Sequence, residues 1–195
     1  MRELIRWSAI LGVGVVAAIS TGQTAAQKPA TKPAPNAHAL VLKDFQDRIN
    51  NYLELHNDVE KGPAQLKETN EPEQIRQAQM RLAERIRAVR KDARPGDIFT
   101  PEIRATFRRL MYPELRGTEG RRTRAEINED APAGVPLKVN ASYPEGASLP
   151  TVPPNLLASL PQLPEDLEYR IIRKDLILRD VNANLIVDFI PNAIQ

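Results

Sequence analysis

The sequence predicts an α+β fold in which a helical N-terminal half precedes a C-terminal antiparallel β-meander. Three patterns carry this prediction. Residues 38–60 and 70–93 repeat apolar positions in alternating steps of four and three, the spacing of packed helices. Residues 165–195 hold three runs rich in β-branched and aliphatic side chains, which is typical of strands. Residues 117–164 are rich in Pro and Gly and predict a connector between these two parts.

The first 26 residues have the pattern of a secretory signal peptide. Arg2 and Arg6 precede an uncharged run over residues 7–19. This run has the length of a signal-peptide core and is shorter than the roughly 20 residues of a membrane-spanning helix. Thr24 and Ala26 are the small residues expected before a cleavage site. We therefore predict cleavage after Ala26 and a periplasmic or extracellular product, with an uncleaved N-terminal anchor as the alternative.

The chain of 195 residues has no cysteine. Disulfides, cysteine ligands, cysteine nucleophiles and a lipid-modified N-terminal cysteine are therefore excluded. Residues 27–37 combine three Pro, two Lys and small side chains, which predicts an extended linker ahead of the folded part.

The helical region is predicted over residues 38–116. The stripe of the first helix consists of His38, Leu42, Phe45, Ile49, Tyr52, His56 and Val59, and Gly62-Pro63 ends it. The second helix is predicted to begin at Asn70, with Glu73 completing a capping box, and to stop at Pro95-Gly96. Its stripe consists of Ile75, Gln79, Leu82, Ile86, Val89 and Ala93. Two such helices joined by a short loop predict an antiparallel hairpin.

A third helix is predicted to begin at Thr100-Pro101, which form a cap followed by a first-turn proline. The helical part is therefore either a hairpin or a three-helix unit. In the connector, Gly117, Gly120 and the Arg-rich residues 121–124 predict an exposed loop. Residues 135–141 predict a short strand, and residues 155–160 a short helix between prolines.

The β-meander is predicted over residues 165–195, with strands at 167–172, 176–179 and 185–190. A turn at Arg173-Lys174 places Ile171 opposite Leu176, Tyr169 opposite Leu178, and Glu168 opposite Arg179 as an exposed charge pair. A second turn at Asn182-Ala183 places Leu178 opposite Val187 and Leu176 opposite Phe189. One face then carries Tyr169, Ile171, Leu176, Leu178, Leu185, Val187 and Phe189. The other face carries Ile172, Ile177, Ile186 and Ile190 among charges, and we expect it to be partly covered.

Three stretches of the meander resemble a C-terminal hairpin module of uncharacterised exported bacterial proteins. They are residues 163–170 (LPEDLEYR), 175–180 (DLILRD) and 184–190 (NLIVDFI). The module is similar, more distantly, to the hairpin of periplasmic nickel and cobalt homeostasis proteins. The resemblance implies an exported protein with a hairpin here. It implies no metal ligands that can be placed in this sequence.

The sequence predicts no metal or cofactor site. His38 and His56 share a stripe, but 18 positions on one helix separate them by about 27 Å, too far for one ion. Asp180-x-Asn182-x-Asn184 resembles the start of a calcium loop. That loop requires Gly at its sixth position and Glu at its twelfth, where this chain has Leu185 and Pro191.

The sequence favours a protein that is not an enzyme. The serines beyond the signal peptide are Ser142, Ser148 and Ser159, and none sits in a Gly-x-Ser-x-Gly elbow. A small envelope hydrolase is the alternative, and its candidate residues are His56, Asp180 and Asp188.

Charge is distributed unevenly along the helices. Residues 40–60 hold five acids and two bases, whereas residues 73–124 hold fourteen bases and seven acids. The arginines are expected either to be solvated and paired with the acidic first helix, or to form an anion-binding surface. The residues of that candidate surface are Arg76, Arg81, Arg85, Arg87, Arg90, Arg108 and Arg109.

Together these patterns predict an exported binding or structural factor that acts through helix-mediated association. The expected partners are a second copy of the chain or another envelope protein. The alternative partners are anionic envelope polymers or lipids, which the arginines would bind. Nucleic acid is not expected, because an exported protein rarely meets it.

Overall fold

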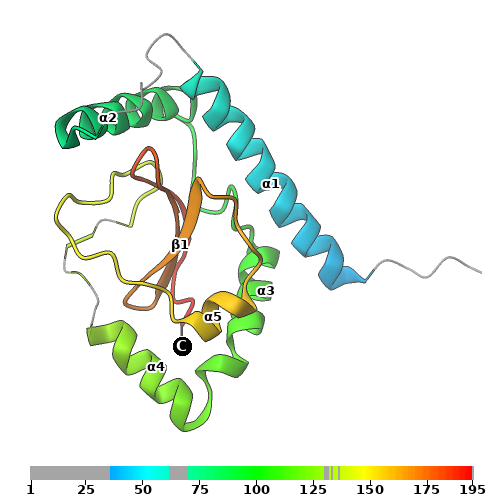
Figure 1. Cartoon of the computed structure of the whole chain (residues 1–195). Coiled ribbons are helices and arrows are strands. Elements are labelled where there is room, and N and C mark those ends of the chain that lie inside the picture. Colours follow the sequence, from blue (N-terminus) through cyan, green and yellow to red (C-terminus); the bar gives the residue numbers. More distant parts are fainter. Residues whose placement is uncertain (1–35, 62–69, 130–131, 133, 136, 195) are drawn as a thin grey trace, which may run out of the picture. The chain divides into compact units, whose positions relative to one another are not determined.

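The computed structural model describes residues 36–61, 70–129, 132, 134–135 and 137–194 (Figure 1). The predicted signal peptide, most of the linker and the loop after residue 61 lie outside these residues. Within them, five α-helices precede a three-stranded antiparallel sheet, which confirms the predicted α+β class. None of the helices in this described part combines the length and the hydropathy needed to cross a bilayer.

The first helix, α1 (Ala37–Glu60), packs its predicted stripe against the sheet. The side chain of Asn36 caps it by accepting a hydrogen bond from the His38 backbone N–H at 3.0 Å. Phe45, Ile49 and Tyr52 are buried in the main core. Figure 1 shows α1 running beside β1 (Leu167–Ile172), the first strand of the sheet.

The second helix, α2 (Pro72–Val89), does not run back along α1 (Figure 1). Its buried residues Leu82, Ala83 and Ile86 form a separate cluster with Ala183 and Leu185 of the sheet region. The apolar stripes of the two helices therefore pack mainly against the C-terminal part of the chain. The two helices do not pack against each other along a coiled-coil seam.

Both ends of α2 differ from the prediction. Glu71 is the N-cap, without a side-chain capping bond, and Pro72 is the first helical residue. The fixed φ of Pro72 suits the first position of a helix. The N-cap is therefore Glu71, one residue after the predicted cap Asn70. The helix ends at Val89, before the predicted stop. The carbonyl of Arg90 accepts a hydrogen bond at 2.8 Å from the Asn140 side chain, so a tertiary contact replaces the next helical turn.

The third helix, α3 (Pro101–Met111), begins as predicted. Thr100 is the N-cap and Pro101 occupies the first turn. The ring of Phe107 meets Phe45 at 4.9 Å and Phe99 at 5.3 Å between centroids, both edge to face. Phe107 also meets Tyr169 of β1 at 6.0 Å. These rings join α1, α3 and the sheet into one core.

The predicted exposed loop after Gly117 is wrong, because a fourth helix, α4 (Gly117–Glu129), occupies this stretch. It follows a 3₁₀ turn over Pro113–Leu115. A Cβ atom at position 120 would collide with the Leu115 backbone, so Gly120 permits the close approach. Thr123 and Ile127 are buried one and two turns later. The short helix α5 (Pro154–Ser159) confirms the helix predicted between prolines.

The first hairpin has the predicted register. In β1 and β2 (Asp175–Asp180), Ile171 pairs with Leu176, Tyr169 with Leu178, and Glu168 with Arg179. The turn bends through Arg173, whose φ of 57° lies in the left-handed region. Arginine rarely adopts this conformation, and the pairing of the two strands imposes it here.

The predicted register of the second hairpin is wrong beyond its turn. β3 (Leu185–Ile190) pairs with β2 through a bulge between Leu178 and Arg179. Leu178 therefore faces Asp188 where Val187 was predicted, and Leu176 faces Ile190 where Phe189 was predicted. The bulge leaves Val187 of β3 without a partner on β2. This extra residue points Ile190 into the main core and Phe189 to the opposite face.

Both faces of the sheet are covered. The second face buries Ile172, Ile177 and Ile186 under Tyr143, in line with the expected partial cover. Arg179 is also on this face and only 8% exposed, so the expectation of an exposed Glu168–Arg179 pair is wrong. The strand predicted over residues 135–141 is not found among the described residues of that range, because Val139 and Asn140 form a turn in which Asn140 has a φ of 63°. The chain meets β3 just after this turn, in an isolated bridge between Ser142 and Leu185.

Candidate functional site

A buried polar cluster joins α1 to the end of β2. Asp180 has no exposed surface, and its Oδ2 accepts a hydrogen bond from the Tyr52 hydroxyl at 2.7 Å. The same oxygen lies 2.7 Å from Nδ1 of His56, which is also fully buried. The other oxygen, Oδ1, accepts from the Ala183 backbone N–H at 2.7 Å and shapes the turn that follows. Residues 124 positions apart in the sequence thus share one hydrogen-bonded site.

The second ring nitrogen of His56 faces an acid. Its Nε2 is buried and has no hydrogen-bond partner, because the Glu60 carboxylate oxygen lies 3.7 Å away. Glu60 is one helical turn along α1, and its side chain is 45% exposed. His56 therefore stands between a buried carboxylate and a half-exposed one.

Burial and neighbouring charges act on the titratable groups of this cluster. Burial alone would lower the pKa of His56. The hydrogen bond and charge of Asp180, with Asp166 and Glu60 farther away, outweigh burial and raise that pKa. Burial and the Asp180 carboxylate both raise the pKa of Tyr52, so its hydroxyl stays a hydrogen-bond donor. Burial lowers the pKa of Arg90, which covers the Tyr52 ring at 4.9 Å.

Asp188 belongs to a different hydrogen-bond set. It lies on β3 without exposed surface and accepts from the backbone N–H groups of Gly96, Ile98 and Phe99 at 2.8 to 3.1 Å. It also accepts from its neighbour Phe189 at 2.8 Å. Its carboxylate therefore holds the loop between α2 and α3 against the sheet.

The structure thus brings two of the three hydrolase candidates, His56 and Asp180, into contact, and places Asp188 elsewhere. A histidine oriented by an aspartate is the arrangement of a general base. Both side chains are fully buried, however, so no substrate atom reaches them in this conformation. The contact acts structurally: it fastens α1 to the sheet and sets the tautomer of His56 through Asp180.

The other polar groups tested in the sequence point to separate partners. Asn182 donates to the Asp166 carboxylate at 2.8 Å. Asn184 accepts from Arg179 and donates to the Tyr143 carbonyl at 3.0 Å. Asp180 bonds to side chains of α1, so the three side chains of the calcium-like motif have separate partners and do not face one common point. His38 is half-buried near the start of α1, away from His56 along the helix.

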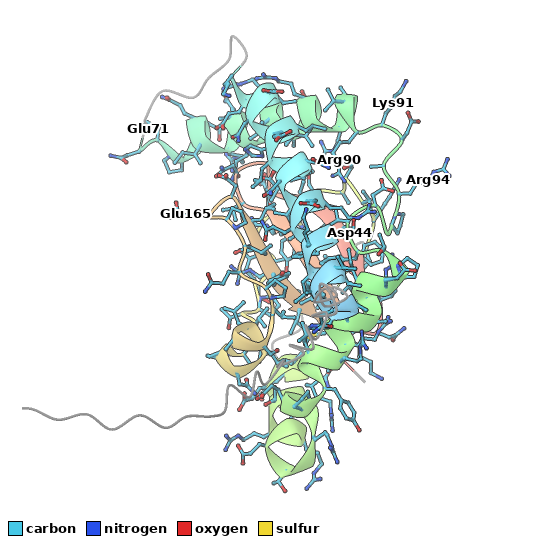
Figure 2. All side chains as sticks on the ribbon, turned by 90° about the vertical axis from the view of Figure 1, so that its right-hand side faces the viewer. Asp44, Glu71, Arg90, Lys91, Arg94 and Glu165 are labelled. Carbon is cyan, nitrogen blue, oxygen red and sulfur yellow. The ribbon has the colours of Figure 1, made fainter. Side chains whose placement is uncertain are left out.

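The arginines do not form one surface, because three of them bind carbonyl groups of the C-terminal half. Arg90 donates to the Val187 carbonyl at 3.2 Å and to the Asn140 side chain at 3.0 Å. Arg87 donates to the Asn140 carbonyl at 2.9 Å, and Arg108 to the Pro191 carbonyl at 2.7 Å. In Figure 2, Arg90 lies among the side chains beside α1, whereas Lys91 and Arg94 project outward. These three arginines fasten helices to the sheet region.

The remaining members of the predicted surface separate further. Arg76 pairs with Glu73 and Arg109 donates to the Thr106 hydroxyl at 3.0 Å. Arg81 and Arg85 line a pocket of about 190 Å³ between the end of α1, α2 and the turn after β2. The carboxylates of α1 do not neutralise any of them. Within the described residues, the carboxylates of α1 form ion pairs only with residues of the same helix, so the expected pairing of acidic and basic helices is not observed.

A larger groove of about 860 Å³ follows the first half of β1. One wall is the strand itself from Leu167 to Arg170, and the other is the chain around α5. Most of the lining is apolar, including Val152, Leu157, Leu160, Leu163 and Leu167. Leu157 of this lining is 49% exposed.

Searches of protein-family models, curated proteins and solved structures found no match to this chain. The polar cluster and the groove therefore rest on their geometry alone. Sequence reasoning missed Tyr52 as a polar partner because its place on an apolar stripe indicates a core residue. The available signal was that two polar rings, Tyr52 and His56, occupy consecutive positions of that stripe.

Proposed function

We propose that this protein is exported and acts as a binding factor that captures an extended segment of a partner polypeptide in the groove beside β1. The basic start, the uncharged run and the small residues before position 27 support export. The groove supports the binding role, and it is the observation that carries the proposal. Apolar grooves of several hundred Å³ with a polar rim are the usual form of a ligand site.

The hydrogen-bond pattern of β1 adds a reason for an extended ligand. The Val181 N–H donates to the Asp166 carbonyl at 2.9 Å, just before the first residue of the strand. Because bonded and non-bonded pairs alternate in an antiparallel ladder, Tyr169 and Ile171 direct their backbone groups away from β2. Within the described residues no backbone partner meets them there. Ile171 has no exposed surface, so the part of this edge that suits strand addition by a partner is the stretch around Tyr169, which lines the groove.

The same geometry modifies the hypothesis of helix-mediated association. Phe45, Ile49 and Tyr52 of α1 and Leu82 and Ile86 of α2 are buried within the protein's own clusters. These stripes are therefore occupied, and we place the partner surface at the groove.

Site-specific photo-crosslinking in the native envelope tests this role. A photoreactive side chain at position 157 should give one defined adduct with an envelope polypeptide. The same group at Val89, which is 56% exposed on α2, is the matched control and should give none. Replacement of Leu163 by Asp in the 157-labelled protein should abolish the adduct. No adduct from position 157, or equal adducts from both positions, would reject the groove. A self-adduct of twice the mass would instead assign the partner as a second copy.

Export is tested separately by the intact mass of the secreted or periplasmic product. A chain that begins near Gln27 supports the signal peptide. A membrane-bound product that retains residues 1–26 contradicts it.

A further inference from the structure

Two arginines on α2 differ from Arg76 and Arg87 of the same helix in having neither an ion pair nor a side-chain hydrogen bond among the described residues. Arg76 pairs with Glu73, and Arg122 on α4 pairs with Glu119 and Glu126. Arg81 and Arg85 make no ion pair or side-chain hydrogen bond within the described residues, although both line the 190 Å³ pocket. They are four positions apart, so they are neighbours on one helix face, where like charges repel each other. An anion between them would relieve that repulsion.

The pocket is built and small. Its polar lining is held in place by hydrogen bonds: Gln79 donates to the Val181 carbonyl at 3.4 Å, and Asn182 donates to Asp166 at 2.8 Å. Ile75, Ala78 and Leu82 supply its apolar wall. A volume below the roughly 300 to 1,000 Å³ of sites for drug-sized ligands selects a compact group.

A buried histidine lies next to Glu60, one of the residues that line this pocket. Glu60 lines the pocket and lies 3.7 Å from Nε2 of His56, the nitrogen without a hydrogen-bond partner. The charges that face this histidine are Asp180, Asp166 and Glu60, with Tyr52 and Arg90 alongside. A protonated His56 would attract the Glu60 carboxylate and compensate its negative charge. The net charge at the pocket would then be the positive charge of Arg81 and Arg85.

We propose that this pocket binds a phosphate group through Arg81 and Arg85. One guanidinium fork satisfies both oxygens of a carboxylate, whereas a phosphate offers three or more oxygens and suits two guanidinium groups approaching from one helix. The phosphate group belongs either to free inorganic phosphate or to an anionic phospholipid headgroup. This site is independent of the groove beside β1.

Calorimetric titration of the full mature chain with inorganic phosphate tests the site. Saturable binding is expected, and Arg81→Ala combined with Arg85→Ala should weaken it by roughly tenfold or more, the scale of losing a charge-assisted contact. Arg121→Ala with Arg122→Ala removes the same charge from the exposed face of α4 and should leave the affinity unchanged. Binding that does not saturate, or an equal loss in both double variants, would overturn the proposal.

Two further arms separate the alternatives. Glu60→Gln removes the opposing carboxylate and should tighten phosphate binding; weaker binding would show that the ligand needs an acceptor, which contradicts an anion site. Vesicles containing phosphatidylglycerol, compared with phosphatidylcholine alone, distinguish a headgroup from free phosphate: retention that depends on Arg81 and Arg85 assigns the lipid. The groove variant Leu163→Asp should bind phosphate normally, so failure of one site is distinguishable from failure of the other.

Discussion

Asp180 and Asp188 are both fully buried carboxylates of the same sheet, yet the protein satisfies them in different ways. Asp188 accepts four backbone N–H groups, three of them from the loop before α3. Asp180 accepts one backbone N–H and is otherwise bound by the side chains of Tyr52 and His56. One carboxylate fastens a loop and the other fastens α1.

The difference matters because the two kinds of donor respond differently to change. A backbone N–H can only donate, so Asp188 has to remain an acceptor at every contact. A histidine can lose its proton or exchange tautomers, so the contact at Asp180 depends on pH. The anchor of the α2–α3 loop has only backbone donors, whereas the anchor of α1 includes a titratable histidine.

The largest effect is expected from Asp188→Asn. The new amide NH₂ would point at backbone N–H groups that cannot accept, so unfolding free energy should fall by about 3 to 5 kcal/mol. Urea unfolding followed by circular dichroism measures this. A loss below that of Asp180→Asn would show that the backbone donors do not make Asp188 the stronger anchor.

A smaller loss is expected from Asp180→Asn, about 1 to 3 kcal/mol. With the new amide NH₂ at the position of Oδ2, an unprotonated His56 nitrogen and the Tyr52 hydroxyl can both accept from it, and the remaining carbonyl oxygen still accepts from the Ala183 N–H. The same urea experiment measures the loss. Hydrogen exchange should locate the destabilisation in α1, and faster exchange confined to residues 94–100 would contradict the assignment of this anchor.

The pH dependence of stability should reside in His56. Because Asp180 raises the pKa of the folded state, the stabilisation is fully present below the unfolded pKa of about 6.5 and is lost as the pH rises through the folded pKa. Unfolding free energy should therefore decline over this range in the native chain and stay level in His56→Gln.

Leu178→Ala is the control for this pH series. It truncates a fully buried side chain that carries no charge, so it should lower stability at every pH and keep the native slope. An unchanged slope in His56→Gln would move the titration to another group.

The smallest effect is expected from Lys43→Ala. The Lys43–Asp47 pair on α1 has its side chains 69% and 54% exposed, and such helical pairs contribute about 0.5 kcal/mol or less. Thermal unfolding at low and high salt measures it. A loss comparable to that of Asp180→Asn would mean that α1 is held mainly by its exposed charges.

The sequence by itself determined the elements with strong local signals. Thr100-Pro101 begins α3 as predicted, because capping depends on a few adjacent residues. The β1–β2 register was also predictable, since a one-residue slip would move every apolar side chain to the other face. The helix α4 escaped prediction because its Gly and Arg residues resemble a loop. Only the approach of Gly120 to Leu115 makes room for it.

Tertiary structure alone decided the register beyond the bulge and the identity of the polar cluster. No local pattern encodes the extra residue of β3, Val187, which lies opposite the step from Leu178 to Arg179, because a bulge is selected by how both sheet faces pack. His56 and Asp180 meet across 124 positions, and nothing in either neighbourhood marks the other as its partner. The division of the arginines followed the same rule. The sequence shows the spacing of the arginines. The position of the C-terminal half of the chain decides which arginines bind a carbonyl group and which line a pocket.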